Sequence, residues 1–336
     1  MKIGKHSWLF NNGVFVQSSA TVSGPKEKLG PLGDTYDYSF DNLYCNEKTW
    51  EKAEKALIEK AINLCIGKTN IRKDAIDLFI GGDLLNQIVT TSYVARDLPT
   101  PYLGVFGACS TSMEALAIAG ALVDSGNSHN VLAGTSSHYA TAERQYRFPT
   151  EYGGQKPDTQ TSTATGAGCV LVNNEQSDIQ VEGATIGQAI DYGATDPLDL
   201  GSAMAPAAAN TIVQHMEDFN RQPDYYDLIL TGDLSSVGTP IFKKMTEQSG
   251  YDLEEIHRDC GLMIYHSNQK VFAGASGCAS SALVTFGYVM QQLKEKKVNN
   301  VLVVATGALL NPTIVQQKES IPCIAHGVVL KRADAS

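Results

Sequence analysis

Residues 77–84 read DLFIGGDL and residues 227–234 read DLILTGDL, and the two octapeptides share five positions in register. In both, a short apolar run follows an acidic, helix-like stretch and ends at a Gly-Asp turn. This pattern is typical of a parallel strand that is covered on both faces of its sheet. The octapeptides therefore predict two buried strands, one in each of two matching halves of the chain.

A second match supports this duplication. The sequence GACS at 107–110 corresponds to GCAS at 277–280, and in both halves the order is strand, glycine-rich turn, helix of small residues and second strand. The expected helices cover 111–124 and 281–294, and the expected second strands cover 131–134 and 301–306. Because this is a βαβ unit that occurs twice, we expect an α/β protein of two similar halves, residues 1–172 and 173–336.

Two of the expected helices differ in how apolar their surfaces are. The segment 111–124 is apolar nearly all round, so we expect it to lie between layers of the fold, whereas 47–65 has a single apolar stripe and should lie outside. One buried and one outer helix together predict a fold of stacked layers of helices and sheets. The segments 138–164 and 191–210 are too long for simple connectors, and we expect them to be functional or interface loops.

Composition and charge exclude several classes of protein. With 43% hydrophobic and 18% charged residues the chain is an ordinary globular protein, and 26 basic against 36 acidic residues argue against a general nucleic-acid binder. The longest apolar stretches fall far short of the ~20 residues of a membrane-spanning helix. Seven cysteines without a C-x-x-C pair fit a reducing compartment. We therefore expect a soluble intracellular protein.

The segment 103–112, LGVFGACSTS, is the most informative candidate site. A strand runs into a turn of small residues, and Cys109 follows at the first turn of the expected buried helix. Free N–H groups and the positive end of the helix dipole favour a thiolate or an anionic ligand at such a position. Cys109 is therefore a candidate nucleophile or part of an anion-binding pocket, and the alternative is a small buried cysteine.

Four motifs resemble, in the same order, those of the thiolase and ketoacyl-synthase superfamily. GACSTS at 107–112 resembles the nucleophile motif, and TGAGCVLV at 165–172 resembles the GDGAGAVLV strand with Thr165 in place of the acidic residue. GASG at 274–277 resembles the segment after the catalytic histidine, and 323–330 resembles the terminal C-x-G-G-G-x-G strand with residues missing. The resemblance implies a five-layer αβαβα fold built from two duplicated halves.

The catalytic partners that this superfamily requires are not found at their expected positions. Residues 228–240 contain no His or Asn and carry Asp233 near the expected place, and 271–278 contain neither residue as well. Each missing oxyanion group is worth roughly 10²–10³-fold in rate, so we expect a non-catalytic protein with a vestigial nucleophile. The alternative is an active condensing or acyl-transfer enzyme that uses the cysteine on acyl-CoA or acyl-carrier thioesters, with His257 or His266 in the missing roles.

Over its whole length the chain is similar to a branch of thiolase-like sporulation proteins of spore-forming bacilli. This resemblance implies a binder of dipicolinic acid (pyridine-2,6-dicarboxylate, DPA), free or as its calcium chelate, that assists DPA uptake into the developing spore. It also implies membrane-protein partners of the same uptake system, peripheral association with the spore inner membrane through them, no cofactor and no resident metal. Two further points stay open: whether the protein forms a homodimer, and whether it is instead a scaffold for membrane proteins whose ligand pocket is vestigial.

A planar dianion is best bound by arginine forks, helix starts and small residues. The expected ligand-binding residues are Cys109, Ser110, Thr111, Arg144, Arg147, Asp233, His266 and Ser276. For the two arginines the alternative is surface pairing with Glu143 and Glu151. The net charge of −10 opposes a free dianion but not a neutral 1:1 calcium chelate.

Three aspartates are further candidates for contact with a chelated calcium. Asp233, Asp191 and Asp196 can offer carboxylate oxygens, which calcium prefers. The alternative is turn and cap chemistry, because Asp is common at loop starts. The sequence favours the turn interpretation, since no EF-hand spacing is present.

Overall fold

The computed structural model describes residues 1–146 and 156–333, and its framework is a sheet path of ten strands. The path runs β12-β11-β14-β15-β10-β3-β9-β7-β5-β6, and β10 and β3 are joined only by the pair Gln180 and Phe15. This single-pair joint divides the path into two five-stranded sheets. The first contains β3 (Phe15–Ser23), β9 (Gly166–Asn173), β7 (Val131–Ser137), β5 (Leu78–Asp83) and β6 (Tyr102–Gly104). The second contains β10 (Ile179–Thr185), β15 (Cys323–Arg332), β14 (Asn300–Ala308), β11 (Leu228–Thr231) and β12 (His257–Asp259).

Short strands extend or link the two sheets. β2 (Ser7–Leu9) pairs with β10, so the N-terminal end of the chain adds to the second sheet, and β1 (Lys2–Ile3) pairs with β2. β4 (Tyr38–Ser39) pairs with β3. β8 (Ser162–Thr163) and β13 (Ala275–Ser276) form a separate parallel pair, which ties the two halves together beside the site.

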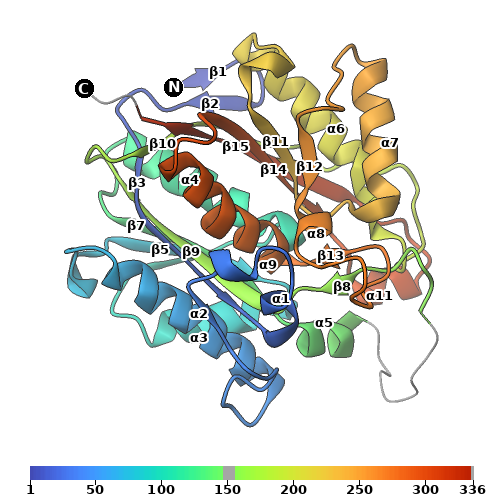
Figure 1. Cartoon of the computed structure of the whole chain (residues 1–336), viewed down its shortest axis with the longest axis horizontal. Coiled ribbons are helices and arrows are strands. Elements are labelled where there is room, and N and C mark those ends of the chain that lie inside the picture. Colours follow the sequence, from blue (N-terminus) through green and yellow to red (C-terminus); the bar gives the residue numbers. More distant parts are fainter. Residues whose placement is uncertain (147–155, 334–336) are drawn as a thin grey trace.

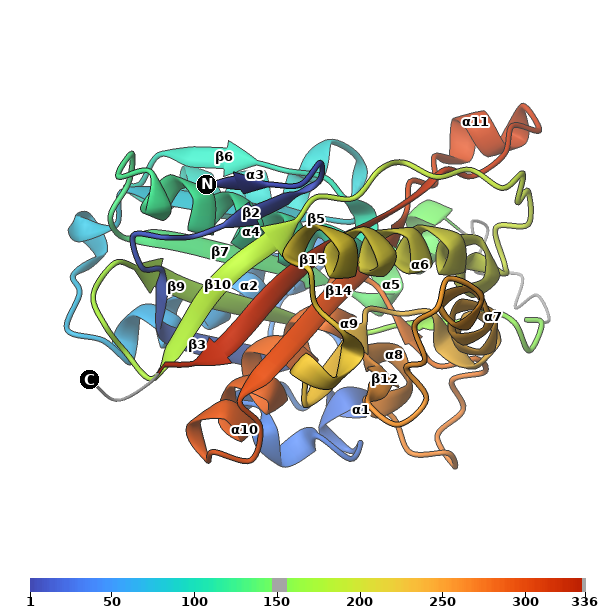
Figure 2. The ribbon, with the colours of Figure 1, turned by 90° about the horizontal axis from the view of Figure 1, so that it is seen from above.

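Helices form three layers around the two sheets, which gives the five-layer arrangement expected from the sequence (Figures 1 and 2). The central layer contains α4 (Thr111–Asp124) and α9 (Cys278–Leu283), which continues through the π-helical Val284–Val289 into α10 (Met290–Lys294). α2 (Trp50–Gly67) and α3 (Val89–Arg96) cover the first sheet, and α6 (Leu200–Phe219) and α7 (Ser235–Gln248) cover the second. The shorter helices are α1 (Pro25–Lys28), α5 (Tyr139–Tyr146), α8 (Cys260–Met263) and α11 (Pro312–Gln316).

The internal repeat predicted two equivalent parallel strands, and the structure shows that their pairing register repeats as well. In the first half Leu78 of β5 pairs in parallel with Val131 of β7, and in the second half Leu228 of β11 pairs in parallel with Val301 of β14. The Gly-Asp turns of both halves therefore lie at equivalent carboxyl ends of parallel strands, which is where α/β proteins build their sites.

The central helix α4 packs as its composition predicts. Met113, Leu116 and Val123 on this helix are buried within one cluster that contains residues of both sheets. Burial of a side chain such as Leu116 contributes roughly 1.5–3 kcal/mol. Among the residues that the structure describes, no helix is both long and apolar enough to cross a bilayer.

The two segments expected as long loops are partly regular. α6 begins at Leu200, so the expectation for 191–210 is wrong from there on, and α5 and β8 lie within 138–164. A Cβ on Gly201 would come 2.3 Å from the carbonyl oxygen of Leu234, so the glycine lets α6 approach α7 closely. The side chain of Asp199 accepts a hydrogen bond from the backbone N of Ser202 and so caps the helix.

Candidate functional site

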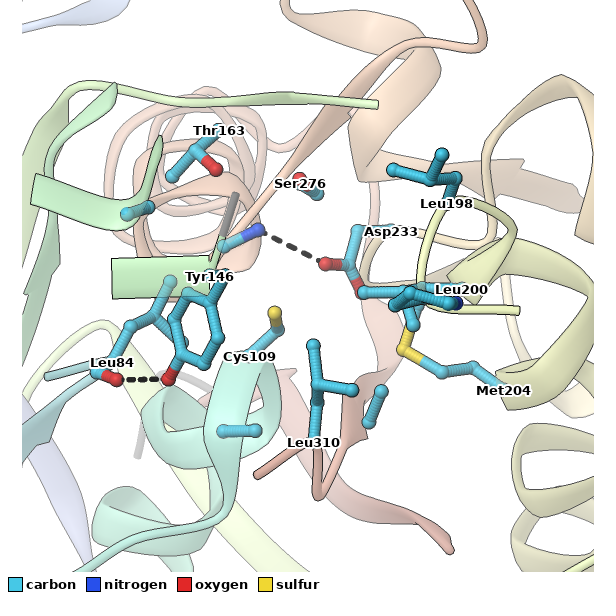
Figure 3. A pocket seen from close by; sticks show the side chains of 15 residues that line it. Leu84, Cys109, Tyr146, Thr163, Leu198, Leu200, Met204, Asp233, Ser276 and Leu310 are labelled. Carbon is cyan, nitrogen blue, oxygen red and sulfur yellow. Dashed lines mark hydrogen bonds between the residues drawn. The ribbon is translucent and has the colours of Figure 1, made fainter. Parts of the chain in front are cut away.

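A cavity of about 290 Å³ lies between the two halves, at the ends of β5 and β11 (Figure 3). It is lined by Leu84, Ala108, Cys109, Ala142, Tyr146, Thr163, Pro197, Leu198, Leu200, Met204, Asp233, Ser276, Gly277, Ala308 and Leu310. Residues of both halves line the cavity, so it lies where the two halves of the fold meet. Most of the lining is apolar, as in many small-molecule sites.

Cys109 lies on a tight turn directly before the central helix, and its sulfur points into the cavity (Figure 3). The hydroxyl of Ser110 donates to the carbonyl of Gly107 at 2.6 Å, and the hydroxyl of Thr111 donates to that of Ala108 at 2.6 Å. Ser110 and Thr111 are buried and are absent from the cavity lining. Both were expected to contact a ligand, but their hydroxyls hold the turn that presents the cysteine.

The pKa of the Cys109 thiol shifts in the direction opposite to that expected from the helix start. Burial raises the pKa of the Cys109 thiol well above its usual range, and the nearby carboxyl of Asp233 raises it further. The backbone N of Gly107, at the start of the turn, already donates to the hydroxyl of Thr111. Cys109 itself is only partly buried, and both effects oppose ionisation of its thiol.

Asp233 follows β11 and is fully buried, with 0% of its surface exposed. Its carboxyl accepts a hydrogen bond from the hydroxyl of Thr306 at 2.7 Å and another from the backbone N of Gly277 at 3.0 Å, and the thiol of Cys109 lies beside it. Burial raises the pKa of Asp233 to about 6, although these hydrogen bonds lower it. The sequence placed Asp233 where the superfamily has a catalytic His or Asn, and the structure brings it next to the cysteine.

The other polar groups of the cavity are neutral. Ser276 accepts a hydrogen bond from the hydroxyl of Thr161 at 2.7 Å, Thr163 lies nearby, and the hydroxyl of Tyr146 donates to the carbonyl of Leu84. Among the lining residues that the structure describes, none is Lys, Arg or His, and Asp233 is the only carboxylic acid. The described part of the cavity thus offers hydrogen-bonding groups but no fixed positive charge.

The remaining predicted ligand residues lie elsewhere. Arg144 forms an exposed ion pair with Glu51 and does not line the cavity. His266 is exposed on a loop and is also absent from the cavity lining. Arg147 lies outside the described residues. Of the eight predicted residues, the cavity therefore unites Cys109, Asp233 and Ser276, and their roles toward a ligand stay a prediction.

The histidines of the enzyme hypothesis do not reach the cysteine. His257 is buried on β12, where its Nε2 lies 2.9 Å from the hydroxyl of Thr231 and its ring packs on Phe242. Burial lowers the pKa of His257 to about 3. Like the exposed His266, it does not line the cavity.

The two other aspartates that were candidates for calcium contact make turn interactions. Asp191 accepts from the backbone N of Gly193, and Asp196 accepts from that of Leu198, both at 2.8 Å. Within residues 1–146 and 156–333 there is no group of three or more His, Cys, Asp or Glu residues that is able to hold a metal ion. For Asp191 and Asp196 the turn interpretation is therefore correct.

The apolar wall of the cavity was missed in the sequence. It is formed largely by Pro197, Leu198, Leu200, Met204 and Leu310. Leu200 and Met204 are four residues apart at the start of α6 and therefore share one face of the helix. The signal was present in the spacing and in the capping Asp199, but the glycine and the proline of this helix obscured it.

Several solved structures share this fold over nearly the whole chain. *Xanthomonas campestris* OleA with bound cerulenin matches with a TM-score of 0.63 at 15% identity, over 96% of this chain and 99% of that one. The 3-oxoacyl-[acyl-carrier-protein] synthase III of *Aquifex aeolicus* gives 0.59 at 16% identity, over 96% and 100%. Human mitochondrial 3-ketoacyl-CoA thiolase in complex with CoA gives 0.59 at 11% identity, over 98% and 100%. The fold is thus that of thiolases and 3-oxoacyl synthases.

Sequence comparison identifies a narrower group. The family model of stage V sporulation protein AD (SpoVAD) matches residues 4–331. The stage V sporulation protein AD of *Bacillus subtilis* (strain 168) is 59% identical over 330 residues, which cover 98% of both chains. The fold of this chain is thiolase-like. By its sequence, the chain belongs to the stage V sporulation protein AD family.

Proposed function

We propose that this protein binds DPA, free or as its calcium chelate, in the Cys109 cavity and delivers it, chemically unchanged, for uptake into the developing spore. Membership of a sporulation protein family supports the biological setting. The observation that carries the proposal is the composition of the cavity, which keeps the position of the cysteine but places Asp233 beside it, with no imidazole among the described lining residues.

The shape and chemistry of the cavity suit a ligand with one aromatic ring. The cavity volume of about 290 Å³ lies at the lower end of the usual range for ligand sites, roughly 300–1,000 Å³. A cavity of this size suits a small ligand with one ring. Leu198, Met204 and Leu310 provide apolar surface for the faces of a pyridine ring. The hydroxyls of Ser276 and Thr163 are available as donors to a ligand carboxylate.

The same cavity argues against thioester condensation. Condensation needs a thiolate and donors that stabilise an oxyanion, and loss of one such donor costs about 10²–10³-fold in rate. Here burial and the nearby Asp233 raise the pKa of the thiol, which opposes the thiolate. The described lining contains no histidine that is able to act as general base.

Acyl transfer remains the second candidate function, because the sulfur of Cys109 faces the cavity of a fold shared with condensing enzymes (Figure 3). Incubation with a series of acyl-CoA thioesters separates the two functions. The binding proposal predicts neither an acyl adduct on Cys109 by mass spectrometry nor release of free CoA. Turnover that is lost in Cys109→Ala would establish the enzyme.

For uptake, the proposal includes membrane proteins of the same system as partners, which would hold this protein at the inner membrane of the spore. Co-purification from sporulating cells under mild detergent tests this part. Recovery of membrane proteins together with the tagged protein is expected, and recovery of the protein alone would count against it.

Calorimetric titration tests the binding itself. The wild-type protein is titrated with DPA, with and without equimolar calcium, and with pyridine-3,5-dicarboxylate as the isomer control. Cys109→Tyr fills the cavity, and Ser267→Tyr on an exposed loop is the matched control. Saturable binding of the 2,6-isomer is expected in the wild type and Ser267→Tyr but not in Cys109→Tyr. Absence of saturable binding in the wild type would refute the proposal.

A further inference from the structure

The ligand and the cavity carry charges of the same sign. Free DPA is a dianion at neutral pH, whereas Asp233 is a fully buried carboxylic acid in the cavity wall. No described lining residue is a base. An ionised Asp233 beside a dianion in a low-dielectric site would be strongly unfavourable, because buried like charges are poorly screened.

We propose that Asp233 takes up one proton from solvent when the free dianion enters, and that its carboxyl group then donates a hydrogen bond to a carboxylate of the ligand. This inference rests on the proposed function. The proton balance is simple: one dianion and one proton enter the site together, and no covalent bond to carbon changes. The neutral calcium chelate does not require this proton, so its binding should be less coupled to pH.

The surroundings of Asp233 favour a neutral carboxyl group once an anion is bound. Among residues 1–146 and 156–333, the titratable groups that interact with it are Cys109 before α4, Asp259 on β12, Cys260 on α8 and Cys323 on β15. All four are acids, so none of these described groups compensates a negative charge. Burial already raises the pKa of Asp233 to about 6. A dianion bound nearby would raise this pKa further, because a like charge disfavours the ionised carboxylate.

The geometry leaves room for the proposed hydrogen bond. Thr306 donates to one oxygen of the Asp233 carboxyl, Gly277 donates to the other, and the thiol of Cys109 is a third hydrogen-bond partner of this group. A carboxyl oxygen has two acceptor positions, and the protonated group has one O–H to donate. Because Asp233 also lines the cavity, we expect an O–H on its carboxyl group to reach a bound carboxylate. The hydroxyl of Thr306 can rotate, so an asparagine side chain can be accommodated in the same place.

Two calorimetric measurements test the inference. The first compares DPA binding near pH 7.5 in buffers of different ionisation enthalpy, which reports proton uptake directly. We expect between about half and one proton per DPA for the wild type. The calcium chelate should take up fewer. The second follows affinity from about pH 6.5 to about pH 8.5, where we expect the Kd of the wild type for DPA to rise toward about tenfold per pH unit.

Variants separate a proton-carrying role from a structural one. Asp233→Asn keeps a hydrogen-bond donor without a charge, so it should bind DPA with little pH dependence and no proton uptake. Asp233→Ala lacks the donor and should bind weakly at every pH. Asp191→Asn, which changes an exposed turn carboxylate, should behave as the wild type. Equal losses in Asp233→Asn and Asp233→Ala would overturn the inference.

The proposed function and this inference fail in different ways. Absence of DPA binding by the wild type at every pH would refute the function and the inference together. Saturable binding of DPA without proton uptake would refute the inference alone. Proton uptake is measured on the wild-type protein, so the test does not depend on whether the variants fold.

Discussion

Replacement of Asp233 by Asn should make Cys109 more reactive toward alkylation. Two unit charges about 4 Å apart interact by about 4 kcal/mol at an effective dielectric of 20, which corresponds to about three pKa units as an upper limit. Hydrogen bonds from Thr306 and Gly277 delocalise the charge of Asp233, so we expect the pKa of the Cys109 thiol to fall by about one to three units.

The gain in rate is smaller than the gain in thiolate. A thiolate of lower pKa is also a weaker nucleophile, with a Brønsted coefficient of about 0.5, so half of the pKa change is lost. The second-order rate constant for iodoacetamide at about pH 8 should therefore rise about 3- to 30-fold in Asp233→Asn. The readout is the alkylated peptide that contains Cys109, followed by mass spectrometry over time. An unchanged rate in Asp233→Asn, or an equal rise in the control Asp191→Asn, would refute the electrostatic argument.

Three further predictions concern stability and the cysteine turn. Burial raises the pKa of Glu114 to about 7, above its value in the unfolded chain, so this carboxyl lowers stability progressively as pH rises from about 4.5 to about 7. Urea unfolding of Glu114→Gln should thus show a gain of about 1–3 kcal/mol at pH 8 and little at pH 4.5, and equal gains at both pH values would contradict this. In Gly307→Ala the new Cβ would come 2.2 Å from the carbonyl oxygen of Gly107, so we expect a loss of about 1–3 kcal/mol in unfolding free energy and weaker DPA binding, whereas unchanged affinity would count against the role of this contact. Leu116→Ala should cost about 2–5 kcal/mol in the same unfolding assay, and a cost below about 1 kcal/mol would contradict its place in the core.

The architecture was predictable because the same order of strand, turn, helix and strand occurs in both halves of the sequence. The octapeptides that begin at Asp77 and Asp227 fix equivalent strands, and the apolar surface of 111–124 places that helix between the sheets. α6 was missed at its start because Gly201 and Pro206 are usually signs of a loop. Here the glycine allows close helix packing, and the proline lies buried within the helix. Such roles depend on tertiary neighbours that the local sequence does not specify.

The site was predictable only where the chain itself carries the signal. Cys109, Asp233 and Ser276 were found from motif positions, and the cavity unites them. The helix start predicted a lowered pKa for the Cys109 thiol, whereas burial and the carboxyl of Asp233 raise it. The local sequence does not show this, because Asp233 comes from the other half of the chain. Arg144 was assigned to the ligand for its chemistry, but Glu51 on α2 provides its partner.

Protection of Cys109 from alkylation tests most directly whether DPA binds in this cavity. The wild-type protein is treated with iodoacetamide at increasing concentrations of DPA, and modification of the Cys109 peptide is followed by mass spectrometry. The account predicts that DPA slows this modification saturably, with the same Kd as calorimetry, and that pyridine-3,5-dicarboxylate does not. Saturable calorimetric binding of DPA with an unchanged rate of Cys109 modification would place the ligand elsewhere and contradict the account.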